Sequence, residues 1–390
     1  MRKIFLTAIA VLSIATTQVF GMYGVDTDWI FFLTHGNQFR ARLDQLGFTL
    51  GNDMIKGTFG FDNNTGFGGT YGAMLQRDGT SGDFYDWVPS ISMGIGYTSS
   101  AIGIGVGYNA TVGPRTQKFN GKDTAKTVNK SAHTPVLVLN AMDNAFRMAI
   151  PIQVYVNNDK GSGWKQNEMA VSVDSQFRYY TGLDMLPQVR LYLRYGYYGW
   201  DSEVAGVKDK GKHAESFGFD LRFYFGSVVE EVALQPIVKL AYNGALGKYH
   251  NYARVQAVNA MNGDYATQTV RYGTGVWNLQ LLTALGLTAN SDIVSLYLEP
   301  SLGLKVNGAS SKNVKDTISL GYGVYGEIYV TPIKNLQWYF EAEIGNLNSS
   351  VSGIATDTAG TTYDLSGSAT SSKYLGFNAS TGITWYLPAL

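Results

Sequence analysis

The fold is decided by the run Ser295-Leu296-Tyr297-Leu298-Glu299-Pro300-Ser301-Leu302-Gly303-Leu304-Lys305-Val306. Side chains alternate between the two faces of a β-strand, so one face of this run carries only Leu, Pro and Val, and the other carries Ser, Tyr, Glu, Gly and Lys. The run is about twice as long as a usual soluble strand of about 5–6 residues. Such strands are typical of a wall between lipid and water. A sheet can lie in lipid only as a closed barrel, because an open edge leaves backbone groups unpaired.

The N-terminus has the composition of a secretory signal. Arg2 and Lys3 precede an apolar run over residues 4–14, and small or apolar residues follow up to Gly21. A basic start, a short apolar run and a small residue at the cleavage point predict a signal peptide over residues 1–21. Beyond it, no apolar run approaches the roughly 18 residues that a membrane helix needs, so any crossing is expected to use strands.

Composition and charge exclude several classes of protein. The 390 residues include 46 glycines and 13% aromatic residues, and 30 basic residues balance 30 acidic ones, which gives no nucleic-acid footprint. The absence of cysteine excludes disulfides, thiolate metal sites and a lipid-anchored cysteine. Since no linker divides the chain, we expect the signal (1–21), an N-terminal segment forming a plug or short helix (22–38), and one β-barrel domain (39–390).

Turns and loops alternate in length along the chain. Short turns separate strand pairs, and longer polar stretches lie between them at 78–86, 113–133, 157–166, 201–212, 246–271 and 308–314. Short periplasmic turns and long extracellular loops are typical of outer-membrane barrels. The pattern predicts thirteen strands after residue 87 and three before it, at 39–50, 54–61 and 67–75. We therefore predict an all-β, antiparallel transmembrane barrel of about sixteen strands, with fourteen as the alternative, since the bacterial barrels have an even number.

The competing fold is a soluble β-sandwich, or a pair of them, in the periplasm. Aromatic residues favour the membrane, because two belts of Tyr and Trp mark the two interfaces of a bilayer. One predicted belt, at the loop ends of strands, contains Tyr85, Trp87, Trp200 and Tyr242. The other, near the turn ends, contains Tyr179, Tyr180, Phe225, Trp338, Trp385 and Tyr386.

The first sixty residues carry a family resemblance. The stretch Gly21-Met22-Tyr23-Gly24, followed by Asp28-Trp29-Ile30-Phe31-Phe32-Leu33-Thr34-His35-Gly36-Asn37-Gln38-Phe39 and then Ile55-Lys56-Gly57-Thr58-Phe59-Gly60-Phe61, resembles the variable surface proteins of intestinal spirochaetes. The resemblance implies an abundant outer-membrane protein of variable sequence that is exposed to the host immune system. It implies no catalytic residues.

Three classes of function follow from a surface barrel. A barrel of about sixteen strands leaves an aqueous lumen unless it is plugged, which favours a porin-like channel for passive diffusion. The alternatives are a sealed barrel that displays loops as a scaffold or adhesin and, more remotely, an outer-membrane hydrolase. We expect no enzyme and no cofactor, because His133, His213 and His250 lack the nucleophile and orienting partners of a catalytic site. The expected partners are outer-membrane lipid, a second copy of the chain, and host surface molecules or antibodies at the loops.

Charged residues at inward positions are the candidate pore-lining residues. The middle strands supply Arg147, Arg178, Arg190, Arg194, Arg222 and Lys239, and the later strands supply Glu299, Glu327, Glu341 and Glu343. The two sets are expected to face each other across the lumen, where opposed charges set a transverse field. The alternative is that the charges form salt bridges that brace or seal the wall.

Two loops carry unusual side chains. The stretch 113–131 contains five basic residues against a single aspartate, which suggests contact with anionic polysaccharide or lipid headgroups, although a solvated loop has the same composition. The stretch 246–271 is rich in Tyr, Val and Met. We expect these side chains to be buried, since secreted proteins avoid such exposed apolar surface. The loop then folds into the barrel, packs against a second barrel, or packs on itself.

Overall fold

The computed structural model describes residues 23, 27–42, 45–63, 89–112, 116–118, 125–127, 130–229, 232–247, 252–257, 275–310, 316–346, 354–356, 362–364 and 376–388. The predicted signal peptide, the strand expected at 67–75, and most of the loops at 78–86, 113–133 and 246–271 lie outside these residues. Among the described residues, no helix is long and apolar enough to cross a membrane.

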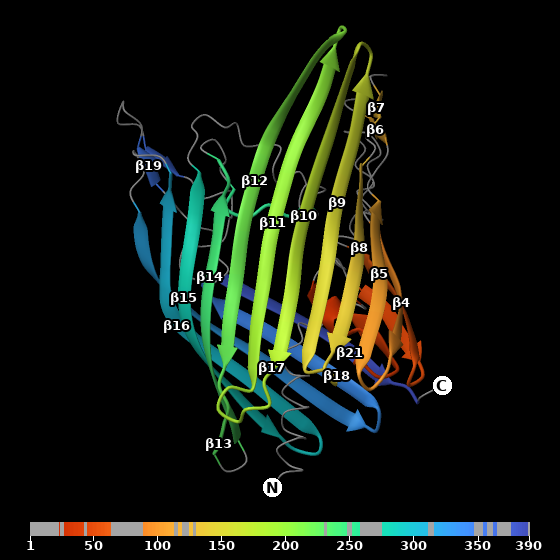
Figure 1. The fold of residues 1–390 in the computed structure, drawn as a ribbon, viewed down its shortest axis with the longest axis vertical. Coiled ribbons are helices and arrows are strands. Elements are labelled where there is room, and N and C mark those ends of the chain that lie inside the picture. Colours follow the sequence, from red (N-terminus) through yellow and green to blue (C-terminus); the bar gives the residue numbers. More distant parts are fainter. Residues whose placement is uncertain are drawn as a thin grey trace.

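Sixteen strands form a closed antiparallel barrel, as the sequence predicts (Figure 1). The first strand closes the ring by pairing with the last, Gln38 opposite Tyr386 and Arg42 opposite Gly382. The wall consists, in order, of β1 (Gln38–Arg42), β2 (Gln45–Gly51), β3 (Ile55–Asn63), β4 (Pro89–Thr98), β5 (Ile102–Val112), β8 (Lys130–Ala141), β9 (Phe146–Gly161), β10 (Trp164–Tyr180), β11 (Gln188–Val204), β12 (Val207–Tyr224), β14 (Val232–Ala245), β15 (Val276–Asn290), β16 (Val294–Ala309), β17 (Thr317–Ile333), β18 (Leu336–Gly345) and β21 (Gly376–Tyr386).

Several short strands lie outside this ring, at its ends. β6 (Thr116–Lys118) pairs with β7 (Ala125–Thr127), and β19 (Ile354–Thr356) pairs with β20 (Thr362–Asp364). β13 (Ser227–Val229) pairs with the start of β14.

The N-terminal part of the ring is divided differently from the prediction. The segment 39–50, expected as one strand, is a hairpin in which Phe39 on β1 pairs with Phe48 on β2. The expectation overlooked a change of phase: apolar positions are odd in β1 (Phe39, Ala41) and even in β2 (Leu46, Phe48), and the chain reverses between them. With β3, the hairpin supplies the three strands that complete sixteen.

Two predicted loops are extensions of the wall. The stretches 157–166 and 201–212 lie almost wholly in strands, because β9 pairs with β10 and β11 with β12 up to two-residue turns. Gly163, Ala205 and Gly206 have φ values of 75°, 50° and 83°, the left-handed conformation that tight hairpin turns require. Polar composition made these stretches look like loops. As a result β9–β12, with 16–18 residues each, rise above the rest of the barrel (Figure 1).

The barrel has an apolar outside and a polar inside. On β16, Leu302 and Leu304 are 53% and 50% exposed on the outer face, whereas Lys305 is 4% exposed on the inner face. Buried Thr, Ser, Asn and Gln side chains occupy inner positions on most strands. This is the reverse of a soluble domain, in which apolar side chains point inwards, and it agrees with the predicted wall between lipid and water.

Only part of the predicted aromatic belts faces outwards. Trp338, Trp385 and Tyr179 are exposed on the outer face. Their predicted companions include Tyr180, which lies against Arg147, and Tyr386, whose hydroxyl donates to Gln337 inside the barrel. Trp200 also faces inwards, against the ring of His213, while Tyr85 and Trp87 lie outside the described residues. Neighbouring residues point to opposite faces of a strand, so only one of two consecutive aromatic residues can reach lipid.

The N-terminal segment lies inside the barrel. Residues Thr27–Phe31 form a 3-10 helix, η1, and five consecutive apolar residues, 29–33, are buried together with Tyr23. They pack against inward-facing Val136, Val138 and Ala149 of the wall. We refer to the described residues of this segment, 23 and 27–35, as the luminal plug.

Glycines on the inner wall make room for the luminal plug. A Cβ added at Gly107 of β5 would lie 2.3 Å from the ring of Trp29, and one at Gly94 of β4 would lie 2.7 Å from it. A Cβ at Gly96 would lie 2.4 Å from Leu33. The glycine-rich run 103–107, superficially like a dinucleotide loop, is therefore a smooth strand surface beneath the plug.

The last residue of the plug, His35, links it to Tyr23 and to the wall. The Nδ1 atom of His35 lies 2.7 Å from the hydroxyl of Tyr23, and the backbone carbonyl of His35 accepts a hydrogen bond from Lys56. Burial, together with nearby Arg40, lowers the pKa of His35 well below its usual value. The ring therefore stays neutral and can keep its hydrogen bond to Tyr23 at neutral pH.

The glycine surface can be tested by a matched pair of substitutions. Gly107→Ala should lower the free energy of unfolding by about 1–3 kcal/mol, because the new methyl group overlaps Trp29. Gly57→Ala is the control, because its Cβ would have no neighbour closer than 3.9 Å. Denaturant titration of the folded barrel, with protease protection of the plug as a second readout, measures both. Equal stability of the two variants would contradict the packing.

Candidate functional site

A row of basic side chains crosses the inner wall. Arg178 on β10 lies opposite Arg147 on β9 and Arg190 on β11. Arg190 lies opposite Arg222 on β12, which lies opposite Lys239 on β14. We call these five residues the basic row. Like charges directly opposite each other destabilise a sheet, so the row requires compensation from its surroundings.

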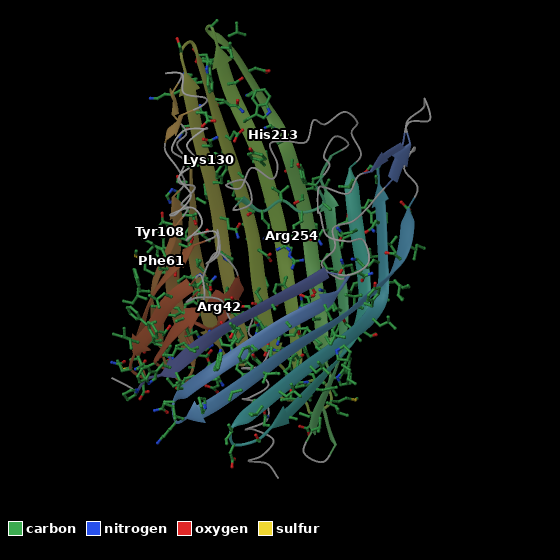
Figure 2. All side chains as sticks on the ribbon, turned by 180° about the vertical axis from the view of Figure 1, so that it is seen from behind. Arg42, Phe61, Tyr108, Lys130, His213 and Arg254 are labelled. Atoms are coloured by element: carbon green, nitrogen blue, oxygen red, sulfur yellow. The ribbon has the colours of Figure 1, made fainter. Side chains whose placement is uncertain are left out.

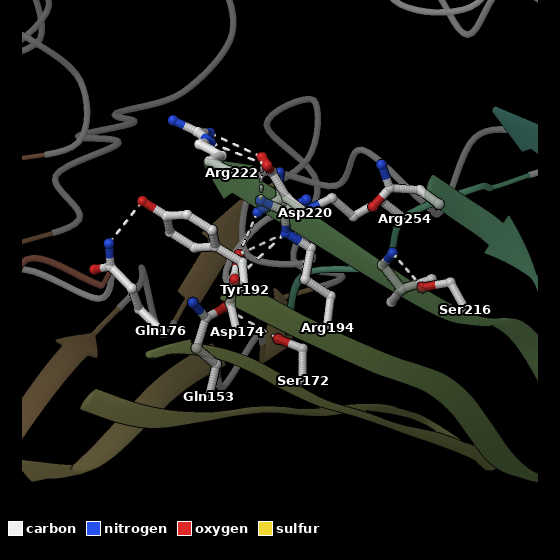
Figure 3. Close-up of polar contacts among 12 residues, drawn as sticks. Gln153, Ser172, Asp174, Gln176, Tyr192, Arg194, Ser216, Asp220, Arg222 and Arg254 are labelled. Carbon is white, nitrogen blue, oxygen red and sulfur yellow. Dashed lines mark hydrogen bonds and ion pairs between the residues drawn. The ribbon is translucent and has the colours of Figure 1, made fainter. Parts of the chain in front are cut away.

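Aspartates next to the row supply part of that compensation. Asp220, 2% exposed, lies 2.8 Å from Arg222, 3.4 Å from Lys239 and 3.8 Å from Arg194, each measured from a carboxylate oxygen to a side-chain nitrogen (Figure 3). Asp174 lies 3.3 Å from Arg194 on the neighbouring strand. The sequence left open whether the luminal charges form salt bridges or remain unpaired. The structure shows salt bridges on the strands that carry the basic row, β9–β14, which we call the basic wall.

Tyrosine rings support the guanidinium groups. The Cζ atom of Arg190 lies 4.2 Å from the ring centroid of Tyr224. Arg222 and Arg194 lie 5.0 Å and 5.6 Å from the centroid of Tyr192. Cations over aromatic faces are attracted by the ring quadrupole, and the contacts hold the flexible side chains in place.

The luminal plug covers one end of the row. Arg178 lies over the ring of Phe31, 4.3 Å from its centroid. Arg147 donates a hydrogen bond of 3.3 Å to Thr34. These two predicted pore-lining residues therefore bind the plug.

A second segment enters the lumen from the loop side. Within residues 252–257, the amide of Val255 donates to the hydroxyl of Ser216 at 2.7 Å, and the amide of Ala257 donates to the hydroxyl of Ser172 at 2.8 Å (Figure 3). Both serines are inward-facing and buried. The described part of the loop 246–271 thus folds inwards, one of the three arrangements expected for it. We call residues 252–257 the inner strap.

The inner strap adds a charge to the basic wall. Arg254 forms an ion pair with Asp174, and Figure 2 shows Arg254 in the interior of the barrel. Val255 and Ala257 are buried against Ala132, Tyr155, Ala170, Tyr198 and Ala214 of the wall. The strap is therefore anchored by backbone hydrogen bonds, apolar packing and one ion pair.

The opposite wall is acidic. Glu327 accepts hydrogen bonds from the hydroxyls of Tyr325 and Tyr329, the latter at 2.9 Å. Glu341 accepts from Tyr325 at 3.3 Å and forms an ion pair with Arg42 of β1. These carboxylates are held by tyrosine hydroxyls on β17 and by the arginine of the closing strand.

A cavity of about 540 Å³ lies between the two walls. Its lining brings together seven of the ten predicted pore-lining residues, namely Arg178, Arg190, Arg194, Arg222, Lys239, Glu299 and Glu343. Arg147, Glu327 and Glu341 do not line it. Asp28 of the plug and Arg254 of the strap complete the lining, so both luminal segments border the cavity.

Several residues in and beside the cavity lining were not predicted from the sequence. Tyr192 and Tyr224 occupy the same inward positions as the arginines, and period-two counting would have found them. Arg42, which pairs with Glu341 outside this lining, could have been found by the same counting. Arg254 and Asp28 lie on the strap and the plug, whose entry into the lumen has no periodic signal.

Histidines form no metal-binding cluster in the part of the chain that the structure describes. His133 lies 2.6 Å from the hydroxyl of Tyr108, and the ring of His213 lies 4.6 Å from that of Tyr198. His250 lies outside the described residues. Among described residues, no group of three His, Asp or Glu side chains could hold a metal ion.

Asp220 should be critical for the stability of the basic wall. Asp220→Asn leaves three partly buried cations without their shared, buried carboxylate, and we expect the free energy of unfolding to fall by about 3–5 kcal/mol. Asp209→Asn, at the exposed tip of β12, removes the same charge from a solvated site and should change it by less than about 0.5 kcal/mol. Denaturant titrations of both variants measure the difference. An equal loss in both would show that Asp220 is not specifically required.

Comparison with known proteins identifies the family. The family model for the Serpulina hyodysenteriae variable surface protein matches residues 2–386, nearly the whole chain. No curated protein matches the chain. The resemblance seen in the first sixty residues therefore extends over the entire barrel, and the chain belongs to the Serpulina hyodysenteriae variable surface protein family.

Proposed function

We propose that this chain is an outer-membrane surface protein whose barrel forms a narrow, porin-like channel for passive diffusion. The observation that carries the proposal is a closed barrel with an apolar exterior and a charged cavity of about 540 Å³ inside. Closed barrels of this kind can lie in lipid because they have no open edge. The predicted signal peptide supports export to that membrane.

The geometry supports a selective passage rather than a wide one. The luminal plug and the inner strap both border the cavity, so solutes would pass between these segments and the charged walls. Basic side chains on β10–β14 line it together with Glu299 and Glu343. In a lumen with low-dielectric walls, opposed charges create a field that selects ions and dipolar solutes.

The second candidate is a sealed barrel that displays its outer hairpins as an antigen or adhesin. It is supported by the tight packing of the luminal plug and by the ion pairs on the basic wall. Conductance of purified protein in planar bilayers separates the two functions. Discrete channel events support diffusion, and a silent bilayer with correctly folded protein supports the display scaffold.

Ion selectivity tests the role of the basic wall. Replacing Arg190, Arg194 and Arg222 together by Gln removes three positive charges from the cavity lining, and the ratio of cation to anion permeability should rise several-fold. The control replaces exposed Lys165, Lys208 and Lys210 by Gln, which removes the same charge from the hairpin tips. Reversal potentials in a salt gradient report both. If the luminal variant keeps the wild-type potential, the charged wall does not select ions.

The orientation of the barrel has a direct test, because the chain contains no cysteine. Lys208→Cys places a thiol at the tip of the raised β11–β12 hairpin, and Lys334→Cys places one in the short turn after β17. A membrane-impermeant maleimide applied to intact cells should label the first thiol and not the second. Lysed cells control for reactivity and should show labelling of both. Labelling of only the turn on intact cells would invert the orientation.

A further inference from the structure

We propose that Ser131, His133 and Tyr108 form a site on the outer face of the barrel that hydrolyses carboxylic esters of membrane lipids. The Nε2 atom of His133 lies 3.1 Å from the hydroxyl oxygen of Ser131, and its Nδ1 atom lies 2.6 Å from the hydroxyl oxygen of Tyr108. A nucleophile, a base and a group that orients the base are the three parts of a hydrolytic serine site. This activity goes beyond the proposed channel and does not depend on whether the lumen conducts.

Strand pairing brings the three side chains together. Ser131 and His133 are two residues apart on β8, so they point to the same face of the strand, opposite to buried Ala132 and Thr134. Tyr108 belongs to β5, and the pairing of β5 with β8 brings it next to His133 although 25 residues separate the two in the chain. The expectation of no enzyme rested on the sequence alone, in which this orienting partner of His133 is too distant to be noticed.

The site lies where the outer face of the barrel changes from apolar to polar. On its apolar side, Leu137 of β8 and Ile152 of β9 are both 40% exposed. On the side of the raised hairpins, the next outward residues of β9 are exposed Asn158 and Lys160. The ester groups of a glycerolipid lie at the corresponding boundary of a bilayer, between the hydrocarbon core and the headgroups. The position of the site therefore matches the depth of the bond to be broken.

The reaction uses water as its second substrate. With the ring proton of His133 on Nδ1, that atom donates to the hydroxyl oxygen of Tyr108, and Nε2 accepts the proton of Ser131. The Oγ atom of Ser131 then attacks the ester carbonyl carbon, the ester C–O bond breaks, and Nε2 passes the proton to the departing lysolipid alcohol. Asn158, the diagonal neighbour of Ser131 on β9, provides an amide donor for the charge that develops on the carbonyl oxygen.

Water completes the cycle. It attacks the acyl group on Ser131 and gives one proton to Nε2 of His133, the bond to Oγ breaks, and that proton returns to Oγ. The net reaction consumes one lipid ester and one water molecule and releases one fatty acid and one lysolipid.

Hydrolysis can be measured on the full-length protein in mixed micelles of detergent and phosphatidylcholine, with the released fatty acid quantified by mass spectrometry. Ser131→Ala and His133→Asn should each lower the rate by about 100-fold or more, because each removes one partner of the proton transfer. Thr283→Ala is the control, because it removes an exposed outer-face hydroxyl that donates to the carbonyl of Leu302, and it should leave the rate unchanged. Heat-dependent gel migration verifies that each variant is folded.

Two further measurements separate catalysis from a structural role of the three residues. Tyr108→Phe keeps the ring and removes the hydroxyl, so kcat should fall by about tenfold or more while KM stays the same. A fluorophosphonate reagent should label Ser131 in the wild type and not in His133→Asn, as measured by peptide mass spectrometry. An unchanged kcat in Tyr108→Phe would overturn the role of Tyr108. No fatty acid release by the folded wild type, an equal rate in folded Ser131→Ala, or equal labelling in His133→Asn would overturn the site. Conductance in planar bilayers, measured separately, bears only on the channel.

Discussion

The pairing of the first strand with the last is the interaction on which the rest of the structure depends. With β1 hydrogen-bonded along β21, no strand of the ring is left as an edge, and the wall can carry Leu and Ile on its outer face without exposing unpaired backbone groups. Closure also determines the interior. Every second residue must point into a shared, confined space, where glycines admit the luminal plug and charged side chains must find partners. The apolar exterior and the polar interior therefore both follow from the closed pattern of strand pairing.

The basic row shows that confining side chains inside the barrel creates electrostatic repulsion that must be compensated. Pairing places Arg178, Arg190 and Arg222 side by side, an arrangement that a sheet built only for stability would avoid. The repulsion is offset by a shared carboxylate at Asp220, by tyrosine faces and by the ring of Phe31. Asp220 and Tyr224 belong to β12, Phe31 belongs to the plug, and Arg254 of the strap pairs with Asp174 of β10, so wall, plug and strap form one electrostatic unit around the cavity.

Most of the barrel wall can be predicted from the period-two pattern of the sequence. It predicts a closed all-β barrel of about sixteen strands and inward positions for the charged residues, because alternation is a local property of each strand, but it takes the β1–β2 hairpin for one strand. The stretches 157–166 and 201–212 were predicted as loops because their side chains, which lie beyond the apolar band, are polar. The strands continue through both stretches. The contacts of Arg254 and Phe31 could not be predicted, since they depend on segments that return to the wall from distant parts of the chain.

The raised hairpins of β9–β12 have a consequence for how such a protein can vary. Each ends in a two-residue turn and is paired to its tip, so its length is free of any contact with the cavity below. Removing or adding one residue on each strand next to the turn keeps every remaining strand side chain on its own face, whereas a single-residue change within one strand would swap the faces beyond it. Length changes in these hairpins should therefore accumulate in even steps, which leaves the cavity lining unchanged while the outline of the raised hairpins shifts.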